Sequence, residues 1–482
     1  MAVDGGRRQS AVGAVGALSS SALLLYLGTG PAPVPALTWS APLPVLLLAP
    51  RVSGRVALVV AFTAAVLGTA NSWAHLLVSD SVPLPTVPVI VLGASLLLTL
   101  AVGLFRALAV RGRPLAAACA APAVWVGGLY LLSLTSPVGV MGTLATTQAD
   151  LPTVIQVAAV TGAWGVEFLA LFVPAAAAAV LAPGVAAAAR LRTGAVVALS
   201  LVVVLGYGAV RQPDSTAPKL RVAAIAQSAN TWATDIAGPA GRDVMRSYVE
   251  QIAALPDGVR LVVLPEAVFA VDEAEMDALL GPLRQAAEAK GADVVVGAIV
   301  RSAAGGKYNT VLGVPADGRP PAVFRKWHVG DSPGTLPGDK LAWLPTGVGL
   351  QNCMDVNFPR PSRDYALAGT SLVAVPADDE DVDGWQHSRT AVLRGVENGM
   401  AMVWAATDGR TIVADAWGRV LAEDRTGGKP FAVAVADVPS GASPTPYSRL
   451  GDWFAWLCVA TALAASAFAI RGPDRAPGRQ RA

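Results

Sequence analysis

The feature that most constrains this fold is the uneven distribution of charge along the chain. Residues 1–212 contain no lysine, ten arginines and only four acidic residues, which are Asp4, Asp80, Asp150 and Glu167. From Lys219 to about Pro446 the charge density is that of an ordinary soluble protein. Over all 482 residues the hydrophobic content is 54% and the mean hydropathy is +0.52, which is too apolar for a soluble protein. The sequence therefore predicts a membrane domain followed by a water-soluble domain.

Long apolar stretches divide the first part of the chain. A membrane-spanning helix needs about 20 apolar residues, and we expect seven spans before the soluble domain and one after it. The predicted spans are residues 11–27, 35–48, 56–78, 87–110, 115–134, 157–181, 195–210 and 453–470. The second is short and rich in proline, so its boundaries are the least defined.

Arginine clusters predict how the membrane domain is inserted. They lie before the first span, between spans two and three, four and five, and six and seven, and after the eighth. The alternate loops 28–34, 79–84 and 135–152 contain no lysine or arginine. Because positively charged loops stay in the cytoplasm, both termini are expected to be cytoplasmic and the soluble domain extracytoplasmic. The first span is expected to remain uncleaved, since no small-residue cleavage site and polar start follow it.

A cysteine at the end of an apolar run is the main chemical signal in the soluble domain. Cys353 follows Gly349-Leu350-Gln351-Asn352 and precedes polar sequence punctuated by proline, a pattern that predicts a strand ending near the thiol. This position fixes the sulfur and leaves a backbone N–H free to face an oxyanion. The other two cysteines fall inside predicted spans, so no disulfide is expected within the domain. The alternative is that Cys353 is only a small buried hydrophobic residue.

Two further apolar runs end in groups that can activate a thiol. Residues 261–264 lead through Pro265 to Glu266, and residues 322–325 lead to Lys326. A partly buried carboxylate can act as a general base, and a nearby lysine can stabilise both a thiolate and an oxyanion. The sequence contains no glycine-rich phosphate loop, no Cys/His zinc spacing and no basic stripe for nucleic acid.

In this chain order, and each at a strand end, Glu266, Lys326 and Cys353 resemble the catalytic triad of the nitrilase (carbon–nitrogen hydrolase) superfamily. Seven spans before such a domain and one after it are similar to the apolipoprotein N-acyltransferase family. The most family-specific piece is the entry to the last span, which runs from Thr445-Pro446-Tyr447 to Gly451-Asp452-Trp453.

This resemblance predicts a polytopic α-helical membrane domain of about eight spans plus an exported αββα nitrilase-like sandwich. The expected boundaries are 1–212 for the N-terminal membrane domain, 213–219 for a linker, 220–446 for the catalytic domain, 447–470 for the C-terminal transmembrane helix and 471–482 for a basic cytoplasmic tail. The expected location is the plasma membrane of a bacterium.

The resemblance also implies an acyl transfer through a thioester. Glu266 would act as the base, Cys353 as the nucleophile, and Lys326 with the backbone N–H of Met354 would hold the oxyanion. The acyl donor would be a phospholipid and the acceptor the α-amino group of a diacylglyceryl-cysteine on a lipoprotein. No metal or cofactor is expected.

Other residues match the family around this triad. Those expected near substrate or behind the triad are Gln227, Trp232, Asn309, Asp355, Trp385, Gln386, His387 and Glu397, with Arg394 on the same predicted helix as Glu397. The family usually has a glutamate soon after its lysine, but no glutamate lies between Lys326 and Cys353. Asp331 or Asp339 is the candidate replacement. The acidic run from Asp378 to Asp381 is also unusual.

Several alternatives remain open from the sequence. His387 is an alternative base for Cys353, and Glu167, the only acid inside a predicted span, is expected to serve packing or a cavity. The whole protein is alternatively a membrane-tethered amidase that uses water in the second step. A third reading is a divergent, non-catalytic relative that binds a partner such as a glycosyltransferase.

Overall fold

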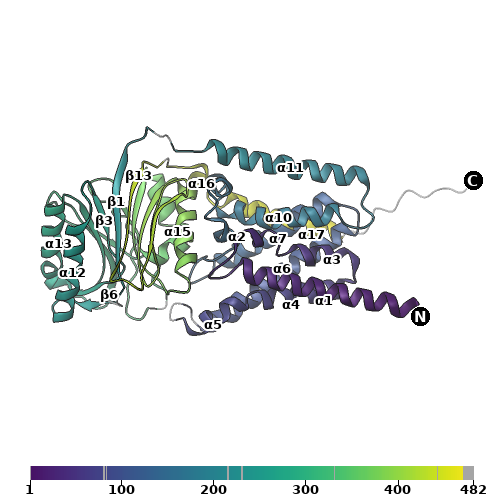
Figure 1. Ribbon diagram of the computed structural model, residues 1–482, viewed down its shortest axis with the longest axis horizontal. Coiled ribbons are helices and arrows are strands. Elements are labelled where there is room, and N and C mark those ends of the chain that lie inside the picture. Colours follow the sequence, from purple (N-terminus) through teal and green to yellow (C-terminus); the bar gives the residue numbers. More distant parts are fainter. Residues whose placement is uncertain are drawn as a thin grey trace, which may run out of the picture.

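The computed structural model describes residues 2–79, 82, 84–213, 216–228, 232–330, 332–441 and 443–470. Figure 1 shows two parts along the long axis of the molecule, a bundle of helices at one end and layered sheets and helices at the other. The bundle is called the helical domain below, and the layered part is called the sandwich domain.

Long apolar helices build the helical domain. Among the described residues, six helices are long and apolar enough to cross a membrane, and the bent pair α4–α5, with an angle of 54°, makes a seventh if it counts as one span. The longer helices are α1 (Ala2–Gly28), α4 (Gly54–Gly68), α5 (Ala70–Val78), α6 (Val87–Ala109), α7 (Pro114–Ser133), α10 (Ala163–Val180), α11 (Ala187–Val210) and α17 (Trp453–Ile470). Short helices connect them: η2 (Leu84–Thr86), η3 (Thr146–Gln148), α8 (Pro152–Ile155) and α9 (Ala158–Thr161).

The predicted span at residues 35–48 is not a single helix. This segment consists of α2 (Pro35–Thr38) and α3 (Leu43–Leu48), followed by the 3₁₀ helix η1 (Ala49–Arg51). Prolines such as Pro42 remove a backbone donor and interrupt a helix. Together these short helices still carry the chain across the helical domain. At one end Thr38 donates to the carbonyl oxygen of Gly28, and at the other end Arg51 donates to the carbonyl oxygen of Leu181.

Helix α1 begins and α17 ends at the end of the helical domain that faces away from the sandwich domain (Figure 1), and three arginines contact helix ends there. Arg51 reaches the end of α10 through the carbonyl oxygen of Leu181, and Arg106 donates to the carbonyl oxygen of Val52 at 2.8 Å. Arg113 lies over the ring of Phe468, near the end of α17, at 3.8 Å from the ring centroid. The arginine-containing loops therefore meet at one end of the helical domain.

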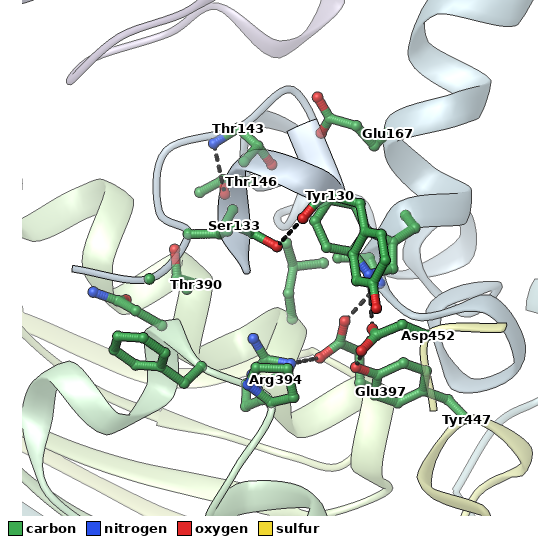
Figure 2. A pocket seen from close by; sticks show the side chains of 18 of the residues that line it. Tyr130, Ser133, Thr143, Thr146, Glu167, Thr390, Arg394, Glu397, Tyr447 and Asp452 are labelled. Atoms are coloured by element: carbon green, nitrogen blue, oxygen red, sulfur yellow. Dashed lines mark hydrogen bonds and ion pairs between the residues drawn. The ribbon is translucent and has the colours of Figure 1, made fainter. Parts of the chain in front are cut away.

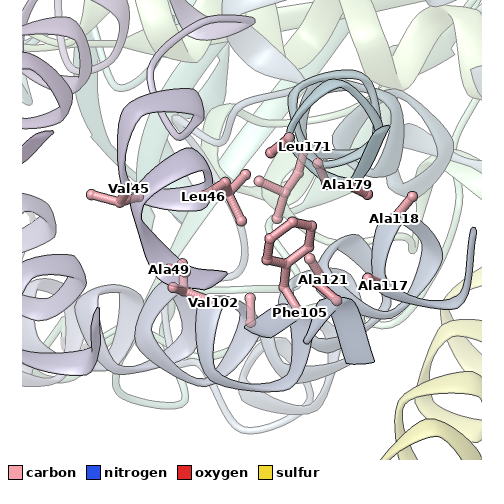
Figure 3. Close-up of a cluster of buried hydrophobic side chains, with 14 of the residues drawn as sticks. Val45, Leu46, Ala49, Val102, Phe105, Ala117, Ala118, Ala121, Leu171 and Ala179 are labelled. Atoms are coloured by element: carbon pink, nitrogen blue, oxygen red, sulfur yellow. The ribbon is translucent and has the colours of Figure 1, made fainter. Parts of the chain in front are cut away.

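Small residues let the helices of this domain pack closely (Figure 3). The buried cluster joins Leu46 of α3, Phe105 of α6 and Leu171 of α10 with alanines such as Ala118 and Ala121 of α7. Close packing of small residues is what holds helices together in lipid, where apolar burial gains little. On the outside, large apolar side chains such as Val12 and Leu199 are exposed, as expected for a surface that faces lipid.

Two β-sheets form the centre of the sandwich domain. The larger has the order β13-β1-β3-β5-β4-β2, with β6 paired to β5 and β7 to β6, and the smaller has the order β12-β11-β10-β9-β8. The strands are β1 (Lys219–Gln227), β2 (Thr234–Asp235), β3 (Leu261–Val263), β4 (Phe269–Asp272), β5 (Asp293–Arg301), β6 (Lys307–Val314), β7 (Ala322–Arg325), β8 (Gly349–Leu350), β9 (Leu372–Asp378), β10 (Ala401–Thr407), β11 (Arg410–Ala414), β12 (Val420–Arg425) and β13 (Phe431–Pro439).

Helices cover the outer face of each sheet, which confirms the predicted αββα sandwich. Helices α12 (Pro239–Ala254) and α13 (Met276–Lys290) pack on the larger sheet, and α15 (Gly384–Asn398) packs on the smaller sheet, between it and the helical domain (Figure 1). A separate core lies between the two sheets. The remaining short helices are η4 (Glu273–Glu275), η5 (Cys353–Asn357), α14 (Ser362–Leu367) and α16 (Pro446–Leu450).

Candidate active site

Three segments that follow strands bring Glu266, Lys326 and Cys353 together. Glu266 follows β3, Lys326 comes directly after β7, and Cys353 opens η5 just after β8. All three residues are buried, with 3%, 8% and 5% of their surface exposed. Because strand ends are fixed by the sheets, these side chains are held in place before any substrate binds.

The carboxylate of Glu266 is held by two donors. Lys326 Nζ lies 2.7 Å from Glu266 Oε1, and Asn309 Nδ2 donates to the same oxygen at 2.6 Å. Asn352, the residue before Cys353, donates to the side-chain oxygen of Asn309 at 2.9 Å. The carboxylate of Glu266, the ammonium group of Lys326 and the turn of Cys353 therefore belong to one hydrogen-bonded chain.

The backbone around Glu266 is tightly enclosed. The N–H of Glu266 donates to the carbonyl oxygen of Ala377 in β9 at 3.1 Å, which links the two sheets at the site. Ala267 has φ of 48°, in the left-handed region that residues with a Cβ seldom adopt. A Cβ on Gly297 of β5 would lie 2.4 Å from the Cα of Glu266, so only glycine fits at that position.

Lys326 remains charged in this environment. Burial alone would lower the pKa of Lys326, but the carboxylate of Glu266, together with Cys353 and Asp355, outweighs burial and raises it. A lysine that keeps its proton cannot act as a base at neutral pH. It can stabilise negative charge on a reacting oxygen or sulfur.

Cys353 is a thiol in the resting protein. Burial raises the pKa of the Cys353 thiol well above its ordinary value, and the charge of Glu266 raises it further while Lys326 opposes this effect. A thiol of this kind needs a base to become a nucleophile. The N–H of Met354, the next residue, has no hydrogen-bond acceptor among the described residues, so it is free to donate to an oxyanion.

Asp355 joins the loop after Lys326 to the turn that carries the cysteine. Its fully buried carboxylate accepts hydrogen bonds from the N–H of His328 at 2.9 Å and from His328 Nδ1 at 2.8 Å. The His328 ring also stacks on Phe358, with 3.7 Å between the ring centroids. These contacts fix η5 relative to Lys326.

A second polar pair, His387 and Asp379, lies beside the sulfur. His387 Nδ1 is 3.9 Å from Cys353 Sγ and 2.7 Å from Asp379 Oδ1. Two ligands of one tetrahedral metal ion with bonds of 2.0–2.1 Å would stand about 3.3 Å apart, so the nitrogen–oxygen separation is that of a hydrogen bond. Burial raises the pKa of Asp379 to about 6, although His387 opposes that shift.

The other predicted residues fall into separate places. Gln227 ends β1, and its N–H donates to the Tyr248 hydroxyl at 3.1 Å. Trp232 is half exposed. Trp385 and Gln386 start α15 on the side of the helical domain, where a Cβ on Gly142 would meet the Gln386 amide at 2.8 Å. Asp331 lies outside the described residues, and the other candidate carboxylate, Asp339, is exposed.

Glu397 lies at the boundary of the two domains, in a cavity of about 110 Å³ that Cys353 does not line. Figure 2 shows Arg394 and Glu397 on one side of this cavity and Glu167 on the other. Arg394 pairs with Glu397, which accepts from the N–H of Ala163 at 2.6 Å. Glu167 accepts from Trp125 Nε1 at 2.6 Å and from the N–H of Ala145 at 2.6 Å. Glu397 therefore joins the two domains, whereas Glu167 contacts only residues of the helical domain and has the packing and cavity position expected for it.

Three residues of the site carried no signal in the sequence. Asn352 lies in the bridge to Asn309, the carbonyl oxygen of Asp378 is 3.4 Å from Cys353 Sγ, and Asp379 holds His387. The aspartates were noted only as part of an acidic run. The packing of β9 and α15 decides which buried residues lie beside the sulfur. No short sequence pattern predicts that packing.

Two family models match this chain. The apolipoprotein N-acyltransferase N-terminal domain matches residues 21–176, and the carbon–nitrogen hydrolase domain matches residues 221–447. A protein of Geobacter metallireducens named apolipoprotein N-acyltransferase is 35% identical over 145 residues, which are 28% of this chain and 27% of that relative. The match thus spans about a quarter of the relative's length.

Two solved structures are also similar to this chain. An amidase from Nesterenkonia sp. AN1 has 20% identity and a TM-score of 0.39, and the alignment covers 47% of this chain and 93% of the amidase. Nit3 of Saccharomyces cerevisiae, a member of branch 10 of the nitrilase superfamily, has 19% identity, the same TM-score of 0.39 and the same coverage of 47% and 93%.

Proposed function

Because this chain belongs to the apolipoprotein N-acyltransferase family, we propose that it moves a fatty acyl chain from a phospholipid to the α-amino group of a lipoprotein's diacylglyceryl-cysteine. The acyl chain rests on Cys353 as a thioester between the two half-reactions.

In the first half-reaction, Glu266 takes the thiol proton while the sulfur of Cys353 attacks the carbonyl carbon of a phospholipid ester. Lys326 and the N–H of Met354 stabilise the negative oxygen that forms. The bond between the carbonyl carbon and the glycerol oxygen then breaks, and Glu266 returns the proton to that oxygen. A lysophospholipid leaves and the acyl chain stays on sulfur.

In the second half-reaction, the lipoprotein amine attacks the thioester carbonyl. The new carbon–nitrogen bond replaces the carbon–sulfur bond, and the proton lost by nitrogen passes through Glu266 to sulfur. The products are an amide and the free thiol. The same two donors stabilise the oxyanion in both half-reactions, so one site performs both.

One observation carries this proposal. The buried Lys326–Glu266 pair, with 2.7 Å between its atoms, lies at strand ends together with buried Cys353, in a domain flanked by two helices that are long and apolar enough to cross a membrane, α11 and α17. Such a domain meets substrates that are themselves embedded in lipid. The runner-up, an amidase that uses water, places the same groups in the same roles and differs only in the second nucleophile.

The proposal is tested by trapping the intermediate. Purified protein is mixed with phospholipid without any lipoprotein, and the peptide that contains Cys353 is examined by mass spectrometry. We expect the mass of one fatty acyl chain on this peptide, removable by hydroxylamine. No acyl adduct would contradict the proposal, and rapid release of free fatty acid without added amine would favour the amidase.

We further propose that the protein lies in the plasma membrane of a bacterium, with both termini in the cytoplasm and the sandwich domain outside it. Arginine contacts at the end of the helical domain opposite the sandwich domain support this orientation, since arginine-rich loops stay in the cytoplasm. Phospholipid and lipoprotein would then reach the site from the outer leaflet.

A further inference from the structure

The sulfur of Cys353 has few polar neighbours within hydrogen-bonding reach. Among the described residues these are the carbonyl oxygen of Asp378 at 3.4 Å and His387 Nδ1 at 3.9 Å. His387 is therefore the one described side chain in such contact with the reacting atom. The triad alone does not explain why a histidine occupies this position.

The imidazole of His387 is fixed on two sides. Asp379 Oδ1 lies 2.7 Å from its Nδ1, and the second oxygen of Asp379 accepts from Trp404 Nε1 at 3.3 Å. The indole of Trp404 also meets the imidazole ring edge-on, with 4.8 Å between centroids and 70° between planes. Asp379 and Trp404 are fully buried. These contacts hold the imidazole ring in place, with Nδ1 near both the carboxylate of Asp379 and the sulfur of Cys353.

Charges from every element around the sulfur bear on this histidine. Glu266 follows β3, Lys326 follows β7, Asp379 follows β9, and Asp383 lies just before α15. Burial alone would lower the pKa of His387, but Asp379, with smaller contributions from Asp383 and Glu266, outweighs burial and raises it. The imidazole is thus biased towards its charged, doubly protonated form, in which Nδ1 carries a hydrogen.

We propose that His387, oriented by Asp379, is a further catalytic residue whose imidazolium donates a hydrogen bond to the sulfur of Cys353 whenever that sulfur is negatively charged. The sulfur is negative as the thiol loses its proton and again as the carbon–sulfur bond of the thioester breaks. In both cases the imidazolium keeps its proton, and the Nδ1 hydrogen is shared between Asp379 and the sulfur. Asp379 acts only through His387 and is a positioning residue.

The inference deepens the proposed acyl transfer and rests on it for its catalytic meaning, but the contact with the thiolate can be measured without any lipid. Removing a positive charge within about 4–6 Å of an ionising group shifts its pKa by about one unit or more. The loss of the imidazolium therefore makes the thiolate of Cys353 harder to form.

The experiment measures alkylation of Cys353 by iodoacetamide from pH 7 to pH 11 in the detergent-solubilised full-length protein, read by mass spectrometry of the Cys353 peptide. The test variant is His387→Asn, whose amide can still donate towards Asp379 but cannot carry charge. We expect its alkylation curve to move up by about one pH unit, which is about a tenfold lower rate at any pH on the rising part of the curve. His387→Gln is the second variant if His387→Asn does not fold.

The matched control is Arg221→Gln. Arg221 also pairs with an aspartate, Asp437, at 3.0 Å, but on an exposed surface, and no hydrogen bond joins it to the sulfur among the described residues. Its alkylation curve should coincide with that of the wild type. A His387 variant with an unshifted curve, or an equal shift in both variants, would overturn the inference. Failure of the acyl transfer itself would appear separately, as a wild-type protein that is alkylated normally but never acylated by phospholipid.

Discussion

Hydrogen bonds from uncharged residues fix the relative positions of the charged groups in the site. The side chain of Asn309 donates to Glu266 at 2.6 Å and accepts from Asn352 at 2.9 Å. The backbone carbonyl oxygen of Asn309 accepts from the N–H of Lys326 at 2.8 Å. One asparagine of β6 therefore sets the spacing of the carboxylate, the ammonium group and the turn of Cys353. Such a network is built before substrate binds, which is how oriented groups accelerate a reaction.

Two substitutions test the roles of the charged pair. Glu266→Gln keeps the shape of the side chain but cannot accept the thiol proton, so thioester formation should slow by about 10²–10⁴-fold. Lys326→Met keeps the aliphatic stem and removes the charge, and should cost about 10²–10³-fold. Single-turnover formation of the acyl-enzyme from phospholipid measures both rates.

The double variant gives the control for this prediction. Its loss should be smaller than the product of the two single losses, because both residues act on one transition state. Full activity of both single variants together with an inactive Cys353→Ala variant would show that the triad assignment is mistaken and that His387 is the base.

A residue of the site could be predicted from the sequence only where it lies at the end of a predicted strand. Glu266, Lys326 and Cys353 follow apolar runs that sheets bury, so their convergence could be anticipated. Asp379 lies in an acidic run that reads as a solvated loop, yet it is fully buried against His387. Only the pairing of β9 with β10 and the packing of α15 on that sheet bring it to the sulfur.

At the scale of elements, the close approach of β5 to the segment after β3 sets the position of Glu266. The N–H of Gly297 in β5 donates to the carbonyl oxygen of Pro265 at 2.9 Å, and the N–H of Val268 donates to the carbonyl oxygen of Gly297 at 3.1 Å. Glu266 lies between these two bonds. The strand therefore supports the turn of Glu266 directly, with no side chain in between.

Gly297→Ala tests this support. The added Cβ would lie 2.4 Å from the Cα of Glu266, so the backbone must move, at a cost of about 1–3 kcal/mol. We expect a lower temperature of thermal unfolding and slower thioester formation. Gly281→Ala in α13 is the matched control, because its Cβ meets nothing within 4 Å and alanine favours a helix by about 0.5–1 kcal/mol. Equal behaviour of the two variants would refute the role of Gly297.

Elements with strong periodic patterns were predictable, and short or irregular ones were not. The apolar runs that became β1, β3 and β5 were recognised. β4 is only four residues long, and the second half of β12 is polar at the edge of its sheet, so neither stands out as a strand. Residues 35–48 have the composition of a span, but their prolines divide the segment into α2 and α3.

At the scale of the whole molecule, α15 and its neighbours join the two domains. Arg394 of α15 pairs with Glu397 and donates to the carbonyl oxygen of Val356 in η5 at 3.0 Å. Glu397 in turn accepts from Ala163 at the start of α10. The turn that carries Cys353 is thus connected through one buried ion pair to a helix of the helical domain.

Arg394→Met should destabilise the protein strongly. It leaves Glu397 as an unpaired buried charge, which costs about 3–5 kcal/mol, and thermal unfolding in detergent measures the loss. Arg221→Met is the control, since Arg221 pairs with Asp437 at 3.0 Å on an exposed surface, where such a pair contributes about 0–1 kcal/mol. Similar unfolding temperatures for both variants would mean that the buried pair does not hold the domains together.

The orientation of the molecule in the membrane is tested by thiol labelling in intact cells. In a Cys353→Ala background, Ala304→Cys lies on an exposed turn after β5, and Ala186→Cys lies on the exposed turn before α11, at the arginine-rich end. A membrane-impermeant reagent should label the first in intact cells and the second only after lysis. The reverse pattern would overturn the assignment of the sandwich domain to the outside.

In the proposed reaction, Cys353 passes an acyl chain from phospholipid to the amine of a lipoprotein. Mass spectrometry of lipoprotein N-terminal peptides tests it most directly, in bacterial cells whose only such enzyme is either this protein or its Cys353→Ala variant. We expect an amide-linked acyl chain on these peptides with the wild-type protein and only the diacylglyceryl group with the variant. An amide-linked chain that persists with Cys353→Ala, or is absent with the wild type, would contradict it.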